Sequence, residues 1–172
     1  METSPVPAPH GPAEQFVAGR RAAAAALAAA GSLQRTVPRA RDGRPLFPRG
    51  FAGSISHTDR LAIAAVVPGA EAVGVDIESA VITPRMAAFL LREQERRLLL
   101  APIGPYTARD LFAAKEAAFK AMNGIDTLEE FLFWQIDLKQ SDGALIATYR
   151  GESVPLWTRA EADLSFAVAI RR

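Results

Sequence analysis

The chain of 172 residues contains no cysteine, which excludes disulfide bonds and thiolate metal sites. It also lacks an apolar run of the roughly 20 residues that a membrane-spanning helix requires. The alanine-rich stretch 22–30 is too short and too weakly hydrophobic for that role. We therefore expect no membrane association and a cytoplasmic location. The net charge of +1 argues against a general nucleic-acid-binding protein.

Lysine is also scarce. The chain has 17 arginines but only 3 lysines, and two of these, Lys115 and Lys120, fall within one six-residue stretch. Lysine is a compact charge whose pKa can shift and which can release a proton, whereas arginine effectively cannot. The distribution suggests that lysine is chemically required in this stretch.

Hydrophobic residues make up 49% of the chain, which is enough for a core. Their pattern indicates an α+β fold of two similar halves, each running from helix through loop to strands. The proline-rich residues 1–12 predict a loose tail. The predicted helices cover 13–30, 84–100 and 107–122. The predicted strands cover 61–67, 72–78, 131–138, 144–150 and 164–170. The first two of these strands are expected to form a hairpin, and SDG (141–143) is expected to turn a second one.

The strand AVGVDIE (72–78) carries two acids at alternate positions. Successive side chains of a strand point to opposite faces, so Asp76 and Glu78 share one face and repel unless a cation lies between them. A solvated strand end would also explain the pair. The alternative is a hard divalent cation, and Mg²⁺ completed by water and phosphate oxygens fits best.

The helix at 107–122 places Phe112, Glu116 and Lys120 on one face, at spacings of four residues. By itself the Glu116–Lys120 pair resembles a surface ion pair worth about 0.3–0.5 kcal/mol. However, KEAAFK embeds its charges among phenylalanine, alanine and methionine, and charges in an apolar setting need partners. Glu116 would therefore supply a third carboxylate to a metal site with Asp76 and Glu78.

The segment RARDGRPLFPR (39–49) holds four arginines against one aspartate. It is either a solvated loop or an anion site, because arginine suits phosphate recognition. His57, which follows in GSISHT, could donate to the same phosphate or serve a structural role. The loop has neither Walker-type spacing nor a GxGxxG pattern, so it is not a standard nucleotide cradle.

Four segments together resemble the 4′-phosphopantetheinyl transferases: FVAGR (16–20), GRPLFPRGFAGSISHT (43–58), VGVDIE (73–78) and FAAKEAAFK (112–120). They occur in family order, cover about residues 13–170, and are most similar to the surfactin-type class and its enterobactin synthase component D branch. The resemblance implies a pseudo-twofold duplicated fold with the active site between two α/β halves. Residues 13–78 would then bind the nucleotide and supply the first metal ligands, and residues 79–172 would contribute the KEAAFK helix and a sheet.

The implied reaction transfers phosphopantetheine from the co-substrate coenzyme A to a serine of apo acyl, peptidyl or aryl carrier proteins. Adenosine 3′,5′-bisphosphate is the other product, and the enzyme is expected to be a monomer. By this resemblance Asp76, Glu78 and Glu116 bind Mg²⁺, or Mn²⁺ in its place. Glu116, directly or through a metal-bound water, is the candidate base for the carrier serine, and Lys120 contacts the phosphates and offsets charge on the leaving group. Lys115 has a supporting phosphate role or a structural one.

The resemblance also assigns the grip on the coenzyme A nucleotide. Ser56 and His57 would hold the 3′-phosphate, and Arg20, Arg39 and Arg44 match basic positions at the nucleotide end. One departure is the N-terminus, where only about fifteen residues precede FVAGR, so the first half is expected to lack an edge strand. Ile77 stands between the two acids, and a water is expected to fill the metal site there.

Two other function classes fit the same residues. One is a catalytically weak module that binds carrier proteins, for which the short N-terminus is the motive. The other is an unrelated Mg²⁺-dependent phosphohydrolase that uses the same acids. For carrier docking, Arg92, Arg96 and Arg97 on the predicted helix 84–100 could meet an acidic carrier surface. A solvated face balanced by Glu93 and Glu95 is the other interpretation of that helix.

Overall fold

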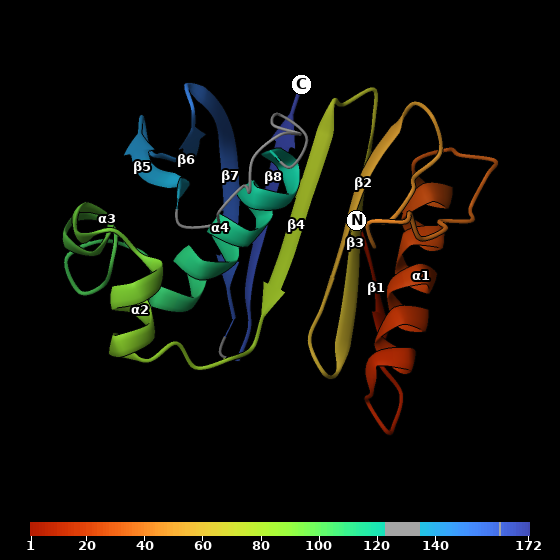
Figure 1. Cartoon of the computed structure of the whole chain (residues 1–172), viewed down its shortest axis with the longest axis horizontal. Coiled ribbons are helices and arrows are strands. Elements are labelled where there is room, and N and C mark those ends of the chain that lie inside the picture. Colours follow the sequence, from red (N-terminus) through yellow and green to blue (C-terminus); the bar gives the residue numbers. More distant parts are fainter. Residues whose placement is uncertain (123–134, 162) are drawn as a thin grey trace.

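The computed structural model describes residues 1–122, 135–161 and 163–172. Its elements form two antiparallel sheets, each packed against a long helix (Figure 1). The strands are β1 (Glu2–Pro5), β2 (Phe51–His57), β3 (Leu61–Pro68), β4 (Ala72–Glu78), β5 (Asp137–Ser141), β6 (Ala144–Tyr149), β7 (Glu152–Ala160) and β8 (Ser165–Arg171). The helices are α1 (Pro12–Ala29), α2 (Pro84–Leu90), α3 (Glu93–Leu98) and α4 (Ala108–Met122). The α+β prediction is confirmed. Among the described residues, no helix is both long and apolar enough to cross a membrane.

The first half packs α1 on a three-stranded sheet of order β1-β3-β2. Proline at the first turn and the Glu14 carboxylate, which accepts a hydrogen bond from the Gly11 N–H at 3.0 Å, start the helix. Gly31, with φ of 83°, follows the last turn. Four alanines of α1 are almost fully buried, so the helix and sheet lie close together; they are Ala18, Ala22, Ala23 and Ala26. The helix predicted at 13–30 is confirmed.

The N-terminal residues differ from the loose tail expected over 1–12. Residues 2–5 form β1, which pairs with β3 in the register Glu2↔Ala64 to Pro5↔Leu61. Val6 continues the contact, because its N–H donates to the Arg60 carbonyl at 2.8 Å and its side chain is buried. The first half therefore has an edge strand, contrary to expectation. Proline can be accommodated there because an edge strand leaves one row of N–H groups unpaired.

The hairpin predicted from 61–67 and 72–78 is wrong, although both strands exist. β3 is paired on both edges, with β1 on one side and β2 on the other, so no edge is free for β4. β4 instead pairs with β8 at the end of a five-stranded sheet of order β4-β8-β7-β6-β5. By its hydrogen bonds β4 belongs to the second sheet, although the sequence placed it in the first half.

The helix predicted at 84–100 is two short helices. Leu91 is extended, with φ of −111° and ψ of 135°, and Arg92 is also extended, which separates α2 from α3. Strands β2 and β7 were not predicted. The strand predicted at 131–138 falls mostly outside the described residues, and β5 begins at Asp137. The turn between β5 and β6 is confirmed: Asp142 and Gly143 both have positive φ, as a type I′ turn requires.

Helix α4 lies on the second sheet and contacts β4 most extensively (Figure 1). Gly74 permits this approach, since a Cβ there would lie 1.8 Å from the Ala117 carbonyl oxygen. Leu111 and Met122 of α4 are fully buried in the core, together with Ile136. The functional face of α4 is consequently held against β4, where the two acids lie.

Candidate active site between the two sheets

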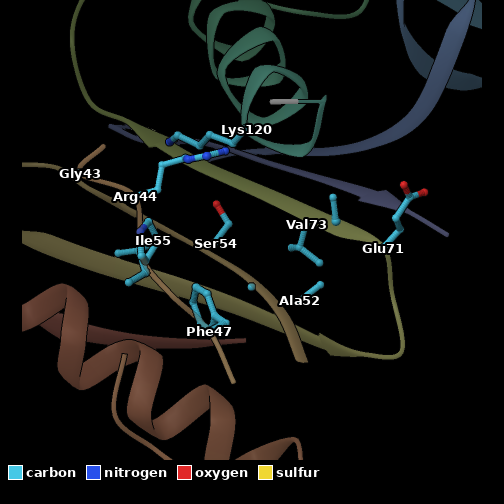
Figure 2. Close-up of a pocket in the computed structure, with 12 residues that line it drawn as sticks. Gly43, Arg44, Phe47, Ala52, Ser54, Ile55, Glu71, Val73 and Lys120 are labelled. Atoms are coloured by element: carbon cyan, nitrogen blue, oxygen red, sulfur yellow. The ribbon is translucent and has the colours of Figure 1, made fainter. Parts of the chain in front are cut away.

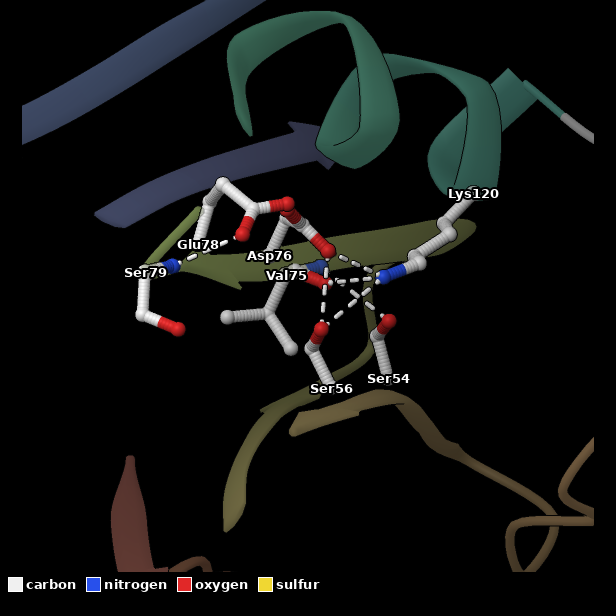
Figure 3. Close-up of polar contacts among 7 residues, drawn as sticks. All are labelled: Ser54, Ser56, Val75, Asp76, Glu78, Ser79 and Lys120. Carbon is white, nitrogen blue, oxygen red and sulfur yellow. Dashed lines mark hydrogen bonds and ion pairs between the residues drawn. The ribbon is translucent and has the colours of Figure 1, made fainter. Parts of the chain in front are cut away.

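Strand β4 joins the two halves through side chains of β2. The Ser54 hydroxyl accepts a hydrogen bond from the Val75 N–H at 3.1 Å, and the Ser56 hydroxyl donates to Asp76 Oδ1 at 2.8 Å. Both serines are buried. The two sheets are thus linked here by hydroxyl groups of β2. The polar residues at this link come from β2, β4 and α4 (Figure 3).

Lys120 and Asp76 form the central ion pair of the site (Figure 3). Lys120 Nζ lies 2.6 Å from Asp76 Oδ1, and it also donates to the Val75 carbonyl at 3.0 Å and to Ser56 Oγ at 3.2 Å. The Asp76 side chain is 8% exposed and that of Lys120 is 28% exposed. A buried carboxylate needs a cation or hydrogen-bond donors, and here Lys120 and Ser56 supply both.

Glu116 and Glu78 lie close enough to this pair to affect its electrostatics. Partial burial raises the pKa of Glu116; Lys120 opposes the shift, and the charges of Asp76 and Glu78 add to it. Burial likewise raises the pKa of Asp76, against the influence of Lys120 and Ser56. Glu78 Oε1 accepts hydrogen bonds from the Ser79 and Ala80 N–H groups at 2.7 and 2.6 Å.

These three carboxylates fit the chemistry of a hard divalent cation. All are oxygen donors, and one is buried beside a positive charge that balances it. Within the described part of the chain, however, no three acidic or histidine side chains lie close enough together to form a metal-ligating cluster. In this arrangement the cation that contacts Asp76 is Lys120. The predicted ligand set of Asp76, Glu78 and Glu116 stays a prediction.

The raised pKa of Glu116 predicts how the stability of the metal-free protein depends on pH. Between the ordinary value of 4.5 and the raised pKa, the folded state binds more protons than the unfolded state. The free energy of unfolding therefore falls as pH rises through this window. Glu116→Gln removes this contribution, so we expect the variant to melt above the wild type at pH 7 in EDTA. The two melting temperatures should converge below pH 4.5.

Thermal melts from pH 4 to 8 test this expectation. Glu152→Gln is the control, because Glu152 is exposed on β7. Parallel pH profiles for the wild type and Glu116→Gln would contradict it.

Two adjoining cavities lie beside the ion pair. The larger, of about 460 Å³, is lined by residues that include Arg44, Ser54 and Lys120 (Figure 2). The smaller, of about 320 Å³, is lined by Arg20, Arg39 and His57 among others. Both share Gly43, Pro45 and Ile55 as lining residues. The basic residues singled out in the sequence are therefore collected along one continuous surface.

Arg20 is the cation of the smaller cavity with the most constrained surroundings. Partial burial, with repulsion from Arg39, lowers the pKa of Arg20. Its guanidinium lies 4.4 Å from the centre of the Phe16 ring. Its buried Nε has no hydrogen-bond partner among the residues that the structure describes. A buried donor without a partner suits an anion site in the smaller cavity.

Lys115 lies apart from both cavities. Its side chain is fully buried, and Nζ pairs with Glu95 Oε2 at 2.8 Å. This placement supports the structural one of its two predicted roles. Glu95 itself was missed, because the sequence suggested that it balanced a solvated face. Glu95 is the third residue of α3, where a glutamate can accept a hydrogen bond from the backbone of the residue that precedes the helix. This capping position could have identified it.

The three arginines considered for carrier docking differ in their surroundings. Arg92 pairs with Asp137 at 2.5 Å and donates to the Gln135 carbonyl at 3.0 Å. Arg96 is half-buried, whereas Arg97 is exposed. Arg92 therefore holds α3 to β5, and Arg97 presents its guanidinium to solvent.

Two family models match this chain. The 4′-phosphopantetheinyl transferase N-terminal domain matches residues 13–67, and the 4′-phosphopantetheinyl transferase superfamily matches residues 72–170. The second model alone spans more than half of the chain. The chain therefore belongs to the 4′-phosphopantetheinyl transferase superfamily, as its four sequence segments indicated.

Individual relatives agree with this assignment. The chain is 37% identical to enterobactin synthase component D of Salmonella typhimurium over 123 residues, which are 68% of this chain and 51% of that protein. It is 31% identical over 110 residues to the 4′-phosphopantetheinyl transferase Npt of Nocardia iowensis, covering 62% and 50% of the two chains. The chain thus spans about half the length of these curated relatives.

A solved structure also resembles the chain. The holo-[acyl-carrier-protein] synthase of Helicobacter pylori, crystallised in complex with coenzyme A, aligns with a TM-score of 0.45 and 23% identity. The alignment covers 57% of this chain and 97% of that one.

Proposed function

We propose that this protein transfers the 4′-phosphopantetheine group of coenzyme A to a serine hydroxyl of an apo acyl, peptidyl or aryl carrier protein. Adenosine 3′,5′-bisphosphate is the other product. One observation carries the proposal: two adjoining cavities are lined by basic residues, and the larger is lined by Lys120, which contacts Asp76 and lies near Glu116. The site lies between the two halves of a single chain, so the proposed enzyme acts as a monomer.

The cavities suit a long polyanionic co-substrate. The smaller cavity, with Arg20, Arg39 and His57, would take the nucleotide end and its 3′-phosphate. A phosphate oxygen there would accept the hydrogen bond that the buried Arg20 Nε does not make within the described residues. Arg44 and Lys120 line the larger cavity, where they would face the pyrophosphate. Ser56 precedes His57 on β2, and its hydroxyl lies at the contact between Asp76 and Lys120.

The three acidic residues are the proposed ligands of a divalent cation. Asp76, Glu78 and Glu116 would hold Mg²⁺, or Mn²⁺ in its place, which when bound neutralises charge on the pyrophosphate. Lys120 would exchange its contact with Asp76 for one with a phosphate oxygen. Lys120 lines the larger cavity, and its three present acceptors belong to β2 and β4.

The transfer step follows from the positions of Glu116 and Lys120. The carrier serine oxygen attacks the phosphorus that bears the pantetheine arm, and a new P–O bond forms. The bond to the bridging pyrophosphate oxygen breaks, and adenosine 3′,5′-bisphosphate leaves with that electron pair. Glu116, directly or through a metal-bound water, takes the serine proton. Lys120 offsets the charge that develops on the leaving group.

The alternative of a weak binding module was motivated by the short N-terminus. Strand β1 supplies the edge strand that the first half was expected to lack, which weakens that motive. The active transferase is the function that the site supports best.

Intact mass spectrometry of an apo carrier protein tests the proposal. After incubation with this protein, coenzyme A and Mg²⁺, the carrier should gain the mass of one phosphopantetheine group. EDTA should abolish the gain, and added Mg²⁺ should restore it. Lys139→Met serves as the control variant, because Lys139 is exposed on β5, and it should transfer at the wild-type rate.

Two results would contradict the proposal. No gain on peptidyl, acyl and aryl carriers, with the protein folded by circular dichroism, would overturn it in favour of a binding module. Phosphate release from nucleotides without any carrier would point instead to a phosphohydrolase.

A further inference from the structure

Lys115 is the largest fully buried side chain among the described residues, and its charge lies within the core of the second half. Glu95 Oε2 lies 2.8 Å from its Nζ, and the two side chains are 3% and 0% exposed. Burial lowers the pKa of Lys115, and Glu95 opposes that shift. Both residues of such a buried pair are needed, because loss of either one leaves an uncompensated charge in the core.

Glu95 contacts two further elements besides Lys115. Its Oε2 accepts a hydrogen bond from the Arg92 N–H at the start of α3, at 2.7 Å. Its Oε1 accepts from the Leu138 N–H of β5, also at 2.7 Å. One carboxylate therefore joins α3, α4 and β5. Both of its oxygens have partners, so its position within the core is well determined.

The position of Lys115 along α4 connects this cluster to the site. Lys115 and Glu116 are consecutive, so they point about 100° apart around the helix. A rotation that moved Lys115 away from Glu95 would turn Glu116 by the same angle relative to β4.

Between Leu111 and Met122, Lys115 is the one long side chain among the buried residues of α4. The others are five alanines, Ala113, Ala114, Ala117, Ala118 and Ala121. These short side chains allow close approach but interlock little with their neighbours.

We propose that Glu95 is a positioning residue for the transfer: through Lys115 it fixes the rotation of α4 and thereby the place of the Glu116 carboxylate. The inference rests on the proposed roles of Glu116 as base and metal ligand. Lys120, one turn beyond Glu116, holds the same helix to Asp76 on the opposite side. Before the substrates bind, the two ion pairs together define the orientation of the face that carries Glu116. Once Lys120 turns to a phosphate, the pair of Glu95 and Lys115 is the one that holds it.

Glu95→Gln tests the proposal, because glutamine keeps the size and the acceptor for Leu138 N–H but leaves Lys115 without its counter-charge. The matched control is Glu93→Gln, which changes an exposed glutamate of the same short helix. We expect kcat to fall by about 10- to 100-fold in Glu95→Gln, as for a misplaced catalytic group. At saturating Mg²⁺ the KM for coenzyme A should stay within about twofold, because the nucleotide cavity is formed by the other half.

Calorimetry gives a second readout that does not depend on transfer. Mg²⁺ should bind several-fold more weakly to Glu95→Gln than to the wild type, whereas the affinity for adenosine 3′,5′-bisphosphate should not change. A purely structural role would lower the melting temperature but leave kcat and the Mg²⁺ affinity of the folded protein unaltered, and that result would overturn the proposal. If Glu95→Gln does not fold, Glu95→Asp keeps the charge on a shorter side chain and replaces it in both measurements.

The two proposals can fail separately. A wild type that binds Mg²⁺ but transfers nothing would overturn the proposed function. The Mg²⁺ affinities of the wild type, Glu95→Gln and Glu93→Gln would then still decide whether Glu95 positions Glu116. A wild type that neither transfers nor binds Mg²⁺ would overturn both.

Discussion

Replacement of Asp76 by asparagine should lower phosphopantetheine transfer by about 10³-fold, the effect of removing a preorganised electrostatic group from a transition state. Asp76 Oδ1 accepts hydrogen bonds from both Lys120 and Ser56, which join the carboxylate to α4 and to β2. Asparagine keeps the shape and can still accept a hydrogen bond from either donor. It loses the negative charge that holds the lysine and that would bind a cation. The loss should therefore appear in the chemistry far more than in the fold.

The measurement is single-turnover transfer to an apo carrier protein, followed by intact mass with the enzyme in excess. Asp59→Asn is the control, because the Asp59 side chain is 64% exposed in the turn between β2 and β3. Circular dichroism should show that both variants are folded. Transfer by Asp76→Asn within tenfold of the wild type would rule out an essential role for this carboxylate.

Replacement of Gly74 by alanine should cause the largest loss of stability. The new Cβ would lie 1.8 Å from the Ala117 carbonyl oxygen and 2.8 Å from the Ala121 nitrogen, both of which belong to the backbone of α4. Neither atom can move without the whole helix, so α4 must separate from β4. We expect a cost of about 3 kcal/mol or more, at the upper end for overpacking. In a chain of this length that lowers Tm by about 10 °C.

Gly11→Ala provides the matched control. The added Cβ would meet only Glu14 Oε2, at 3.0 Å, which is the far end of a flexible side chain. Its cost at the start of α1 should stay below about 1 kcal/mol. Thermal melts compare the two variants, and equal Tm changes would contradict the close packing of α4 on β4. Gly74→Ala should also transfer poorly at temperatures where it is folded, because α4 carries Glu116 and Lys120.

The sequence was most informative where local pattern and chemistry coincide. Proline and glycine mark both ends of α1, and Asp142 with Gly143 specify the turn between β5 and β6. The alternation in AVGVDIE placed the acids on one face of a strand. The family of the chain was likewise readable from four short segments, because each combines glycine or charged residues at fixed spacing.

The sequence was least informative where a partner far along the chain decides the outcome. Whether β4 joins β3 or β8 depends on β1, whose proline-rich residues gave no strand signal. The break between α2 and α3 falls at Leu91, an apolar residue that is compatible with a continuous helix. Glu95 is one of several charged residues in its segment. Its contacts with Lys115 and Leu138, which are distant in the sequence, are what the sequence does not indicate.

The contact between Lys120 and Asp76 has a thermodynamic consequence for a protein that uses both a cation and a polyanion. A divalent cation that arrives alone must displace the lysine from Asp76 and leave an ammonium without its partner. A phosphate that arrives alone must draw the lysine away and leave a buried carboxylate without its partner. When both bind, the phosphate pairs with the lysine and the cation pairs with Asp76. The contact between Lys120 and Asp76 is then broken once for two binding events. On the proposed function, Mg²⁺ and coenzyme A therefore bind with positive cooperativity, and each raises the affinity for the other by the same factor.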